Sequence, residues 1–351
     1  MNYWALSKNE LVKEKTRILN EYEKLKALKL NLNMARGKPS VEQLNLSRGL
    51  LDVLKSDSCC TLKDGTDCLN YGILDGISEI KELFAPVLGV ESEQIFVGGN
   101  SSLSIMFDII SFFMTHGVPG FKPWINQDKI KFLCPCPGYD RHFAILSHFN
   151  IEAIPVPMTN TGPDMDIVET LVTTDPTIKG IFCVPKYSNP QGITYSDETV
   201  KCFSALSTLA PDFRIFWDNA YAIHDLSDTP AHLLNIMDEC QKNGTQDRPL
   251  IFCSTSKITF PGAGVAFLGA SKNNLNTIKE FYSVKTIGFD KINQLRHVRY
   301  FKDYNGLLNH MKKHRDILKP KFDLVINTLK EVFRKQRHFF YRANGWIFYQ
   351  C

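Results

Sequence analysis

Polar residues that could do chemistry follow directly on several short apolar runs of this sequence. Lys257 lies just after LIFCS (250–254), Asp218 follows FRIFW (213–217), and Asn189 lies in PKYSNPQG after GIFCV (180–184). In open α/β sheets, ligands bind at the carboxyl ends of the strands. If the apolar runs are strands, these three side chains are therefore expected at one site.

The lysine and the aspartate each have a definite chemical use in such a setting. An aspartate that follows an apolar strand is costly to bury unless a cation meets it. A lysine enclosed by apolar strands and by the glycines of PGAG (261–264) is expected to be partly desolvated, which favours a nucleophilic amine. Asp218 is therefore expected to face a cation, and Lys257 to act as a nucleophile.

A third group of small polar residues follows the run IFV (95–97). Gly98, Gly99, Asn100, Ser101 and Ser102 precede the helical pattern LSIMFDIISFFM. A helix N-terminus with free backbone N–H groups, small residues and hydroxyls can bind an anion. Serine and asparagine are also ordinary helix caps, so this segment alone leaves both interpretations open.

The combination indicates one cofactor. Tyr139 and His142 follow a further apolar run in PCPGYDRH, and Tyr221 lies three residues after Asp218. Pyridoxal phosphate (PLP) requires a lysine for a Schiff base, a carboxylate on its pyridinium nitrogen and a phosphate cradle. The sequence therefore predicts a PLP site.

The elements that must position these residues alternate along the chain. Short Ile-, Phe- and Val-rich runs bounded by Gly, Pro, Asn or Asp are typical of strands buried on both faces, and amphipathic stretches separate them. A mostly parallel sheet covered by helices is therefore expected. The seven predicted strands lie at 95–97, 130–134, 151–156, 180–184, 213–217, 250–254 and 265–270.

The two ends of the chain have a different pattern. Residues 7–29 are expected to form an amphipathic helix with a capping box at Ser7 and Glu10. The following segment, 31–47, is predicted as a loop because it contains Gly37 and Pro39. Residues 290–335 are again expected to be helical and to begin a second, smaller domain.

Composition excludes several classes of protein. The formal net charge of +4 in 351 residues is too small and too evenly spread for a nucleic-acid binder. No window of about 18 uncharged apolar residues is present, and the N-terminus lacks the pattern of a signal peptide. Ten cysteines are too few for a disulfide-stapled scaffold of this length. A cytoplasmic protein with reduced thiols is expected.

The order and spacing of the motifs resemble those of class I aminotransferases. The segments MARGKPS, LNYGILDGI, VPKYSNPQG, FWDNAYAIHDL and STSKITFPGAGVAF are similar to the divergent bacterial aspartate aminotransferase subgroup, over about residues 31–325. Asn189 and Asp218 are 29 residues apart, and Asp218 and Lys257 are 39 apart. The resemblance implies the α/β fold type I of PLP-dependent transferases, with a mostly parallel seven-stranded sheet in a large domain and a smaller α/β domain. The expected boundaries are 1–45 for the N-terminal helix and active-site loop, 46–288 for the PLP-binding domain and 289–351 for the small domain.

The resemblance also implies the activity and the roles of residues. The expected reaction transfers an amino group between aspartate and 2-oxoglutarate in a cytoplasmic homodimer with shared active sites, with no nucleic-acid, membrane or metal partner. Lys257 would hold PLP as an internal aldimine and carry the proton, and Asp218 would keep the pyridine nitrogen protonated. The resemblance further implies that Tyr139 stacks on the ring, that His142 supports Asp218, and that Asn189 and Tyr221 contact the phenolic oxygen. The implied phosphate contacts come from Asn100, Ser101, Ser102, Ser254, Ser256 and from Tyr71 of the other subunit. The implied substrate contacts come from Arg36, Gly37 and Asn189.

The sequence departs from that family's pattern at two places. The family usually has a phosphate-binding arginine eight residues after the lysine, where this chain has Val265. The likeness also fades near residue 330, so we expect a truncated or frame-shifted product with an incomplete small domain. Arg36, Arg296 and Arg299 are candidate carboxylate binders, although a structural or surface role is favoured for each.

Other interpretations remain as alternatives. A lyase or decarboxylase of the same fold, or a PLP-binding but catalytically impaired product, would use the same lysine and aspartate. Cys134 and Cys136 form no zinc pattern without a second pair and are expected to be buried strand cysteines. His310 and His314 lack the glutamate of a zinc protease and are expected on a solvated helix face.

Overall fold

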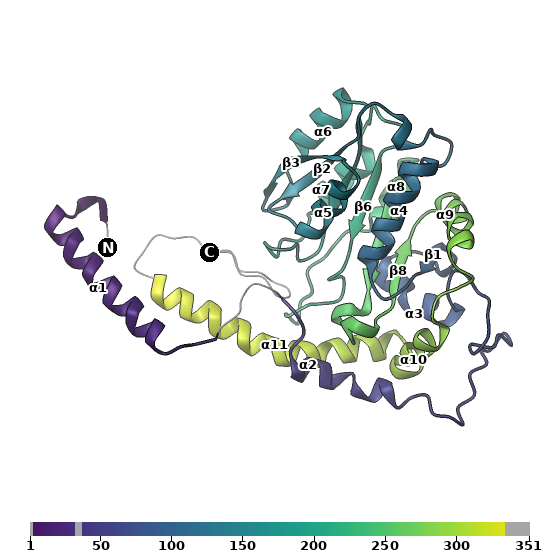
Figure 1. Cartoon of the computed structure of the whole chain (residues 1–351), viewed down its shortest axis with the longest axis horizontal. Helices are drawn as coiled ribbons and strands as arrows, with labels where there is room; N and C mark the ends of the chain where they lie inside the picture. The colour runs from purple at the N-terminus through teal and green to yellow at the C-terminus, as the bar shows by residue number, and fades with distance from the viewer. Residues whose placement is uncertain (1–2, 32–36, 334–351) are drawn as a thin grey trace.

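The computed structural model describes residues 3–31 and 37–333, and its centre is one eight-stranded sheet (Figure 1). The strand order across the sheet is β1-β8-β7-β6-β5-β2-β3-β4. The strands are β1 (Ile95–Val97), β2 (Lys131–Cys136), β3 (Glu152–Thr159), β4 (Gly162–Pro163), β5 (Ile178–Cys183), β6 (Arg214–Asp218), β7 (Pro249–Ser254) and β8 (Ala266–Gly269).

All seven predicted strands are present, and the sheet is mostly parallel. The pairs β2·β3, β2·β5, β5·β6 and β6·β7 are parallel, and β8 is antiparallel to both of its neighbours, β7 and β1. The expected number of strands was one too low. The eighth strand, β4, has two residues and pairs with β3 in a tight hairpin, too short to give an apolar pattern.

Helices cover both faces of the sheet, so the strands are buried on both sides. Along β5, Ile181 and Cys183 pack in one apolar cluster while Phe182 packs in the other. The helices are α1 (Lys8–Ala27), α2 (Val41–Leu46), α3 (Ser78–Leu88), α4 (Ser102–His116), α5 (Asp140–His148), α6 (Met165–Thr174), α7 (Asp197–Ala205), α8 (Ile236–Lys242), α9 (Lys272–Lys285), α10 (Lys291–Phe301) and α11 (Tyr304–Phe333).

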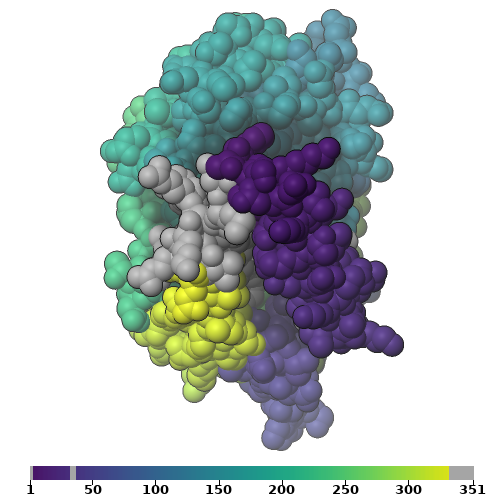
Figure 2. Space-filling view, turned by 90° about the vertical axis from the view of Figure 1, so that its left-hand side faces the viewer, coloured from purple at the N-terminus to yellow at the C-terminus, as the bar shows by residue number. Residues whose placement is uncertain are grey.

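The N-terminal helix was predicted correctly, but it lies apart from the sheet. In α1 the Ser7 hydroxyl accepts from the Glu10 backbone N–H, and the Glu10 carboxylate accepts from the Ser7 backbone N–H, which is the expected capping box. No residue of α1 is buried. Figure 2 shows this helix (purple) standing in front of the body of the molecule.

The segment predicted as a loop after α1 is helical in part. Residues 41–46 form α2, which starts at Ser40 with a second capping box completed by Gln43. The sequence hid this short helix because Gly37 and Pro39 lie just before it. The second helical stretch was predicted correctly, since α10 and α11 occupy residues 291–333.

One prediction about the long C-terminal helix was wrong. His310 and His314 are 4% and 1% exposed, so they lie on a buried face of α11 and not on a solvated one. The physical reason is that α2 and the segment after β7 pack over this face and give both imidazoles hydrogen-bond partners. These hydrogen bonds offset the cost of removing the imidazoles from water.

The described residues bear on the membrane span excluded from composition and on the metal partner that the resemblance does not imply. Among residues 3–31 and 37–333, no helix is long and apolar enough to cross a membrane, and no group of three or more His, Cys, Asp or Glu side chains could hold a metal ion. Cys134 is buried and Cys136 half-buried in β2, and burial raises the pKa of the Cys134 thiol to about 12. Cys134 is therefore a structural strand cysteine.

Candidate active site

The sheet topology brings the predicted site residues to one edge. Strands β2, β5, β6 and β7 run parallel, and β1 runs in the same direction because two antiparallel pairings separate it from β7. Their carboxyl ends therefore meet at the same edge of the sheet. Each of these five strands is followed by one of the predicted polar groups.

Asp218 and His142 form a buried pair at this edge. The His142 Nε2–H donates to Asp218 Oδ2 at 3.0 Å, and the two side chains are 2% and 7% exposed. The imidazole also stacks on Phe182 of β5, with ring centroids 4.4 Å apart. Since a carboxylate only accepts hydrogen bonds, His142 Nε2 must carry the proton.

The second oxygen of this carboxylate is the clearest sign of a missing partner. Asp218 Oδ1 is buried and has no hydrogen-bond partner among the described residues. A buried oxygen in that state is costly, and such groups call for a specific explanation. A bound group with an N–H or a positive charge would satisfy Asp218 Oδ1.

Lys257 lies against the ring of Tyr221 at the same edge. Its ammonium is 4.8 Å from the centroid of the Tyr221 ring. Burial raises the pKa of Tyr139, an effect that the nearby Lys257 charge opposes and the nearby Asp218 charge reinforces. Burial, reinforced by Asp218, also raises the pKa of the Tyr221 hydroxyl, so it stays a neutral donor. The structure thus brings together Lys257, Asp218, Tyr139 and Tyr221.

The expected anion site lies at the N-terminus of α4, where no side chain of the N-cap residue occupies the backbone N–H groups. Ser101 caps α4 with its backbone, but its side chain makes no capping hydrogen bond. The Ser254 hydroxyl donates to Ser256 Oγ at 3.1 Å, and Ser256 Oγ donates to the Asn100 carbonyl at 3.3 Å. The serines after β7 therefore lie against the segment that precedes α4. Ser102, the first residue of α4, is half-buried beside them in sequence.

The remaining predicted residues lie in loops and turns. Asn189 is half-buried in a turn closed by a 2.5 Å bond from the Gly192 N–H to the Ser188 carbonyl, with Gly192 at φ +71°. Tyr71 is 83% exposed, and Gly37 is exposed just before α2. The structure brings neither of these two into contact with the group. Arg36 lies outside the described residues.

The position of the absent arginine is filled by a buried side chain. Val265 is 2% exposed and exchanges hydrogen bonds with Thr255, so no cation can stand there. Arg296 on α10 lines a nearby cavity of about 240 Å³, together with residues 98–100 and 262–265, and its Nε has no partner among the described residues. Arg299 instead donates to the Cys59 carbonyl, which agrees with the expected structural role.

Sequence reasoning missed two histidines close to the lysine. His224, three residues after Tyr221, is 2% exposed, and burial together with the Lys257 charge holds its pKa well below the usual value. His297 on α10 is fully buried and pairs with the hydroxyls of Thr255 and Thr259 at 3.2 and 2.9 Å. The available signal for His297 was its place two residues after Leu295 and next to Val298 in a predicted helix.

His297 makes stability depend on pH. Burial is the main cause that lowers its pKa from 6.5 to about 4 in the folded protein. Between these values the unfolded chain binds a proton and the folded one does not, so stability is lost as pH falls from 6.5 to 4. We expect this histidine to contribute a loss of about 3 kcal/mol by pH 4. Urea unfolding of wild type and His297→Gln at pH 7 and pH 4.5 measures it: the variant should lose less stability, and equal losses would contradict the assignment.

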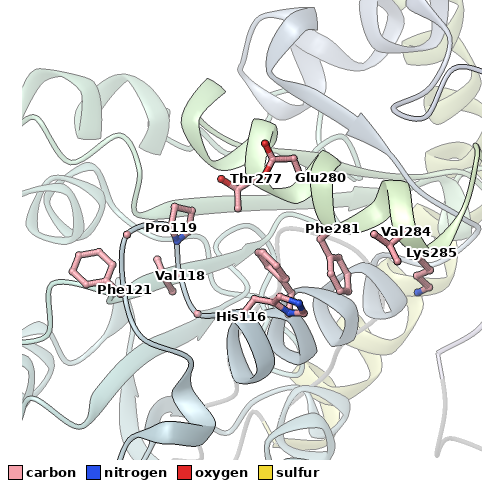
Figure 3. Close-up of a pocket in the computed structure, with 12 residues that line it drawn as sticks. His116, Val118, Pro119, Phe121, Thr277, Glu280, Phe281, Val284 and Lys285 are labelled. Carbon is pink, nitrogen blue, oxygen red and sulfur yellow. The ribbon is translucent and has the colours of Figure 1, made fainter.

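A larger pocket lies elsewhere on the molecule. Between the end of α4 and α9, a surface pocket of about 770 Å³ is lined mainly by apolar side chains, with His116, Thr277, Glu280 and Lys285 at its polar positions (Figure 3). The described residues that line it include none of the predicted site residues. Pocket size therefore does not mark the chemistry in this protein.

The fold and the site define a class of protein. A mostly parallel sheet with a lysine, a histidine-supported aspartate and an open helix end at its carboxyl edge is the arrangement of the fold-type I PLP-dependent aminotransferases. The family model described as aspartate amino-transferase matches residues 6–343 of this chain. The chain belongs to this family.

Individual relatives agree with that assignment. A Mycolicibacterium smegmatis protein provisionally named an aminotransferase is 46% identical over 334 residues, which cover 94% of this chain and 78% of the relative. The aspartate aminotransferase of Corynebacterium glutamicum is 44% identical over 313 residues, covering 89% and 72%. A solved structure of an aspartate transaminase from C. glutamicum superposes with a TM-score of 0.92 at 41% identity and covers 97% of this chain and 80% of that one.

Proposed function

We propose that this aminotransferase binds PLP at Lys257 and transfers the amino group between aspartate and 2-oxoglutarate. The substrate pair is supported by the name of the 44% identical relative from C. glutamicum. The observation that carries the cofactor assignment is the buried Asp218 Oδ1, which lacks a partner among the described residues at the edge of the sheet where Lys257 lies. PLP, when bound, supplies an electron sink for the negative charge that develops on the substrate carbon.

Different residues of the chain would hold PLP in place and move the substrate proton. Asp218 would accept the N–H of the pyridinium ring at Oδ1, while His142 keeps its other oxygen hydrogen-bonded and its plane fixed. Tyr139 would lie against the ring, and Asn189 and the neutral Tyr221 hydroxyl would donate to the phenolic oxygen. The Lys257 amine would then be the group that takes and returns the substrate proton.

The phosphate would be held mainly by uncharged donors. The open N-terminus of α4, with Asn100, Ser101 and Ser102, and the hydroxyls of Ser254 and Ser256 offer these donors. The buried Val265 cannot contribute a charge. Arg296, which faces residues 98–100 across a small cavity, would supply positive charge on this side of the site.

We also propose a cytoplasmic homodimer in which each subunit completes the other's site. The support is a set of exposed side chains around a cavity of about 560 Å³ between residues 68–72 and 286–292. Tyr71 is 83%, Leu69 73% and Ile287 62% exposed there. Lys291 fixes the first of these loops, because its ammonium donates to the carbonyls of Asn70 and Gly72 at 2.6 and 2.9 Å.

A product assay tests the proposed reaction. PLP-loaded protein mixed with aspartate and 2-oxoglutarate should form oxaloacetate and glutamate in equal amounts, and aspartate alone should convert the visible cofactor band to the pyridoxamine form. Release of CO₂ without an oxo acid would indicate a decarboxylase of the same fold. A band that no amino acid changes would indicate a PLP-binding but impaired protein, and absence of a band would contradict the cofactor assignment.

A further inference from the structure

A pair of buried histidines contacts the segment that carries Lys257. The 3-10 helix η5 (Thr255–Lys257) ends at Ile258, whose backbone carbonyl faces α11. His310 Nε2 and His314 Nε2 lie 2.9 and 3.0 Å from this one carbonyl oxygen. The two imidazole nitrogens are 3.1 Å from each other. We call residues 255–259 the Lys257 turn.

The short helix α2 decides which nitrogen of His314 carries the proton. Gln43 Nε2 lies 3.3 Å from His314 Nδ1, and its amide is oriented because Gln43 Oε1 accepts from the Ser40 N–H at 3.0 Å. The Gln43 amide therefore donates, so His314 Nδ1 accepts. It follows that His314 Nε2 carries the hydrogen and donates to the Ile258 carbonyl. A second proton on this imidazole would set its Nδ1–H against the Gln43 N–H.

His310 is held on three sides. Its Nε2 lies 3.3 Å from the Ser47 hydroxyl of α2, and its Nδ1 lies 3.4 Å from the Tyr300 hydroxyl of α10. Tyr300 itself donates to the Leu46 carbonyl at 2.5 Å. The two histidines thus join α2, α10 and α11 to the backbone one residue beyond the lysine.

The contacts concentrate on the Lys257 turn from two directions. His297 of α10 binds the hydroxyls of Thr255 and Thr259, while the pair on α11 binds the carbonyl between them. A lysine side chain has four carbons and many rotamers, so a fixed backbone is what can give its amine a defined position.

We propose that His314, packed against His310, is a positioning residue for the Lys257 amine, donating to the Ile258 carbonyl while its imidazole is neutral. This inference rests on the proposed function of Lys257. Among the described residues, the titratable groups recorded around the pair include Lys313 on α11, Tyr300 on α10 and His224 after β6, while α2 contributes the uncharged Gln43 and Ser47. Burial lowers the pKa of both histidines, that of His314 to about 4, which agrees with the neutral state.

The test separates the position of the amine from the integrity of the site. In apoprotein made from the full chain, the rate of appearance of the visible band after addition of PLP reports capture by Lys257. Binding of pyridoxamine 5′-phosphate, which cannot react with an amine, reports the rest of the site. His314→Leu should slow capture about tenfold at pH 8 and leave pyridoxamine phosphate binding unchanged. His314→Gln keeps an N–H donor and should recover most of the rate, and His232→Leu on the exposed surface is the matched control.

Lowering the pH should slow PLP capture by the wild type, as His314→Leu does, because protonation of His314 disturbs its contact with the Ile258 carbonyl. As pH falls toward 4, the rate of PLP capture should fall further in the wild type than in His314→Gln, because the glutamine has no proton to gain. Unchanged capture in His314→Leu would overturn the proposal. Equal loss of capture and of pyridoxamine phosphate binding would also overturn it, since the role would then be merely structural.

Failure of the proposed function gives a different pattern. If wild type captures no PLP at all, the role of Lys257 is wrong, and the pair is judged by amide hydrogen exchange in residues 255–259. Faster exchange in His314→Leu than in His314→Gln would still support the contact with the Lys257 turn. Equal exchange in the two variants would overturn it.

Discussion

Replacing Lys257 by alanine is expected to abolish the visible band of lysine-bound PLP and to lower transamination by about 10⁴-fold or more. The reason is that two roles end together: the amine is the proposed attachment point of the cofactor and the proposed carrier of the substrate proton. The Lys257 ammonium lies 4.8 Å from the Tyr221 ring in the group around Asp218. Absorbance spectra and initial rates on the same samples measure both effects.

One further variant tests whether positive charge alone is enough at position 257, and a second variant serves as a surface control. Lys257→Arg keeps the positive charge but offers no amine of ordinary nucleophilicity, so it should bind PLP without the visible band and remain inactive. Lys122→Ala, on the exposed surface, should behave as wild type. Wild-type activity in Lys257→Ala would refute the assignment of this lysine.

Replacing Asp218 by asparagine is expected to lower transamination by about 10²–10³-fold while the protein stays folded. Asp218 Oδ1 has no partner among the described residues, whereas Oδ2 accepts from His142 at 3.0 Å. An amide of the same shape cannot supply the negative charge that keeps a ring nitrogen protonated. The loss should therefore appear mainly in kcat, and the absorbance spectrum of the bound cofactor should change with it.

His142 and a remote aspartate provide the comparison for that variant. His142→Asn leaves the carboxylate in place and preserves one donor toward it, so a smaller loss of about tenfold is expected. Asp108→Asn removes a carboxylate in the middle of α4 that accepts from Tyr282 of α9, and transamination should hardly change. If Asp218→Asn were no more impaired than Asp108→Asn, Asp218 would not act on the cofactor.

Much of this arrangement was predictable from local patterns. Strands buried on both faces have nearly continuous apolar runs, so each of the seven predicted strands is present within a few residues. The direction of parallel strands then brings their carboxyl ends to one edge. That rule is enough to group Lys257, Asp218 and the serines before α4 without knowing any contact.

The details that the sequence left open are contacts between distant segments. His314 and Gln43 are 271 positions apart, and His314 and Ile258 are 56 apart. Helical periodicity tells which residues share a face of α11, but not whether solvent or another segment covers that face. Histidine suits both environments, which is why the prediction for His310 and His314 was wrong.

The sequence by itself determined the order of strands along the chain, the residues that follow each strand and therefore the family and its chemistry. The tertiary structure alone decided that Asp218 keeps one buried oxygen without a partner among the described residues, that Val265 is buried, and that α2 and α11 close over the Lys257 turn. The physical reason is that a strand or a helix depends on neighbours in the sequence. Burial and hydrogen-bond partners depend on what packs against it, and here those partners come from both ends of the described chain.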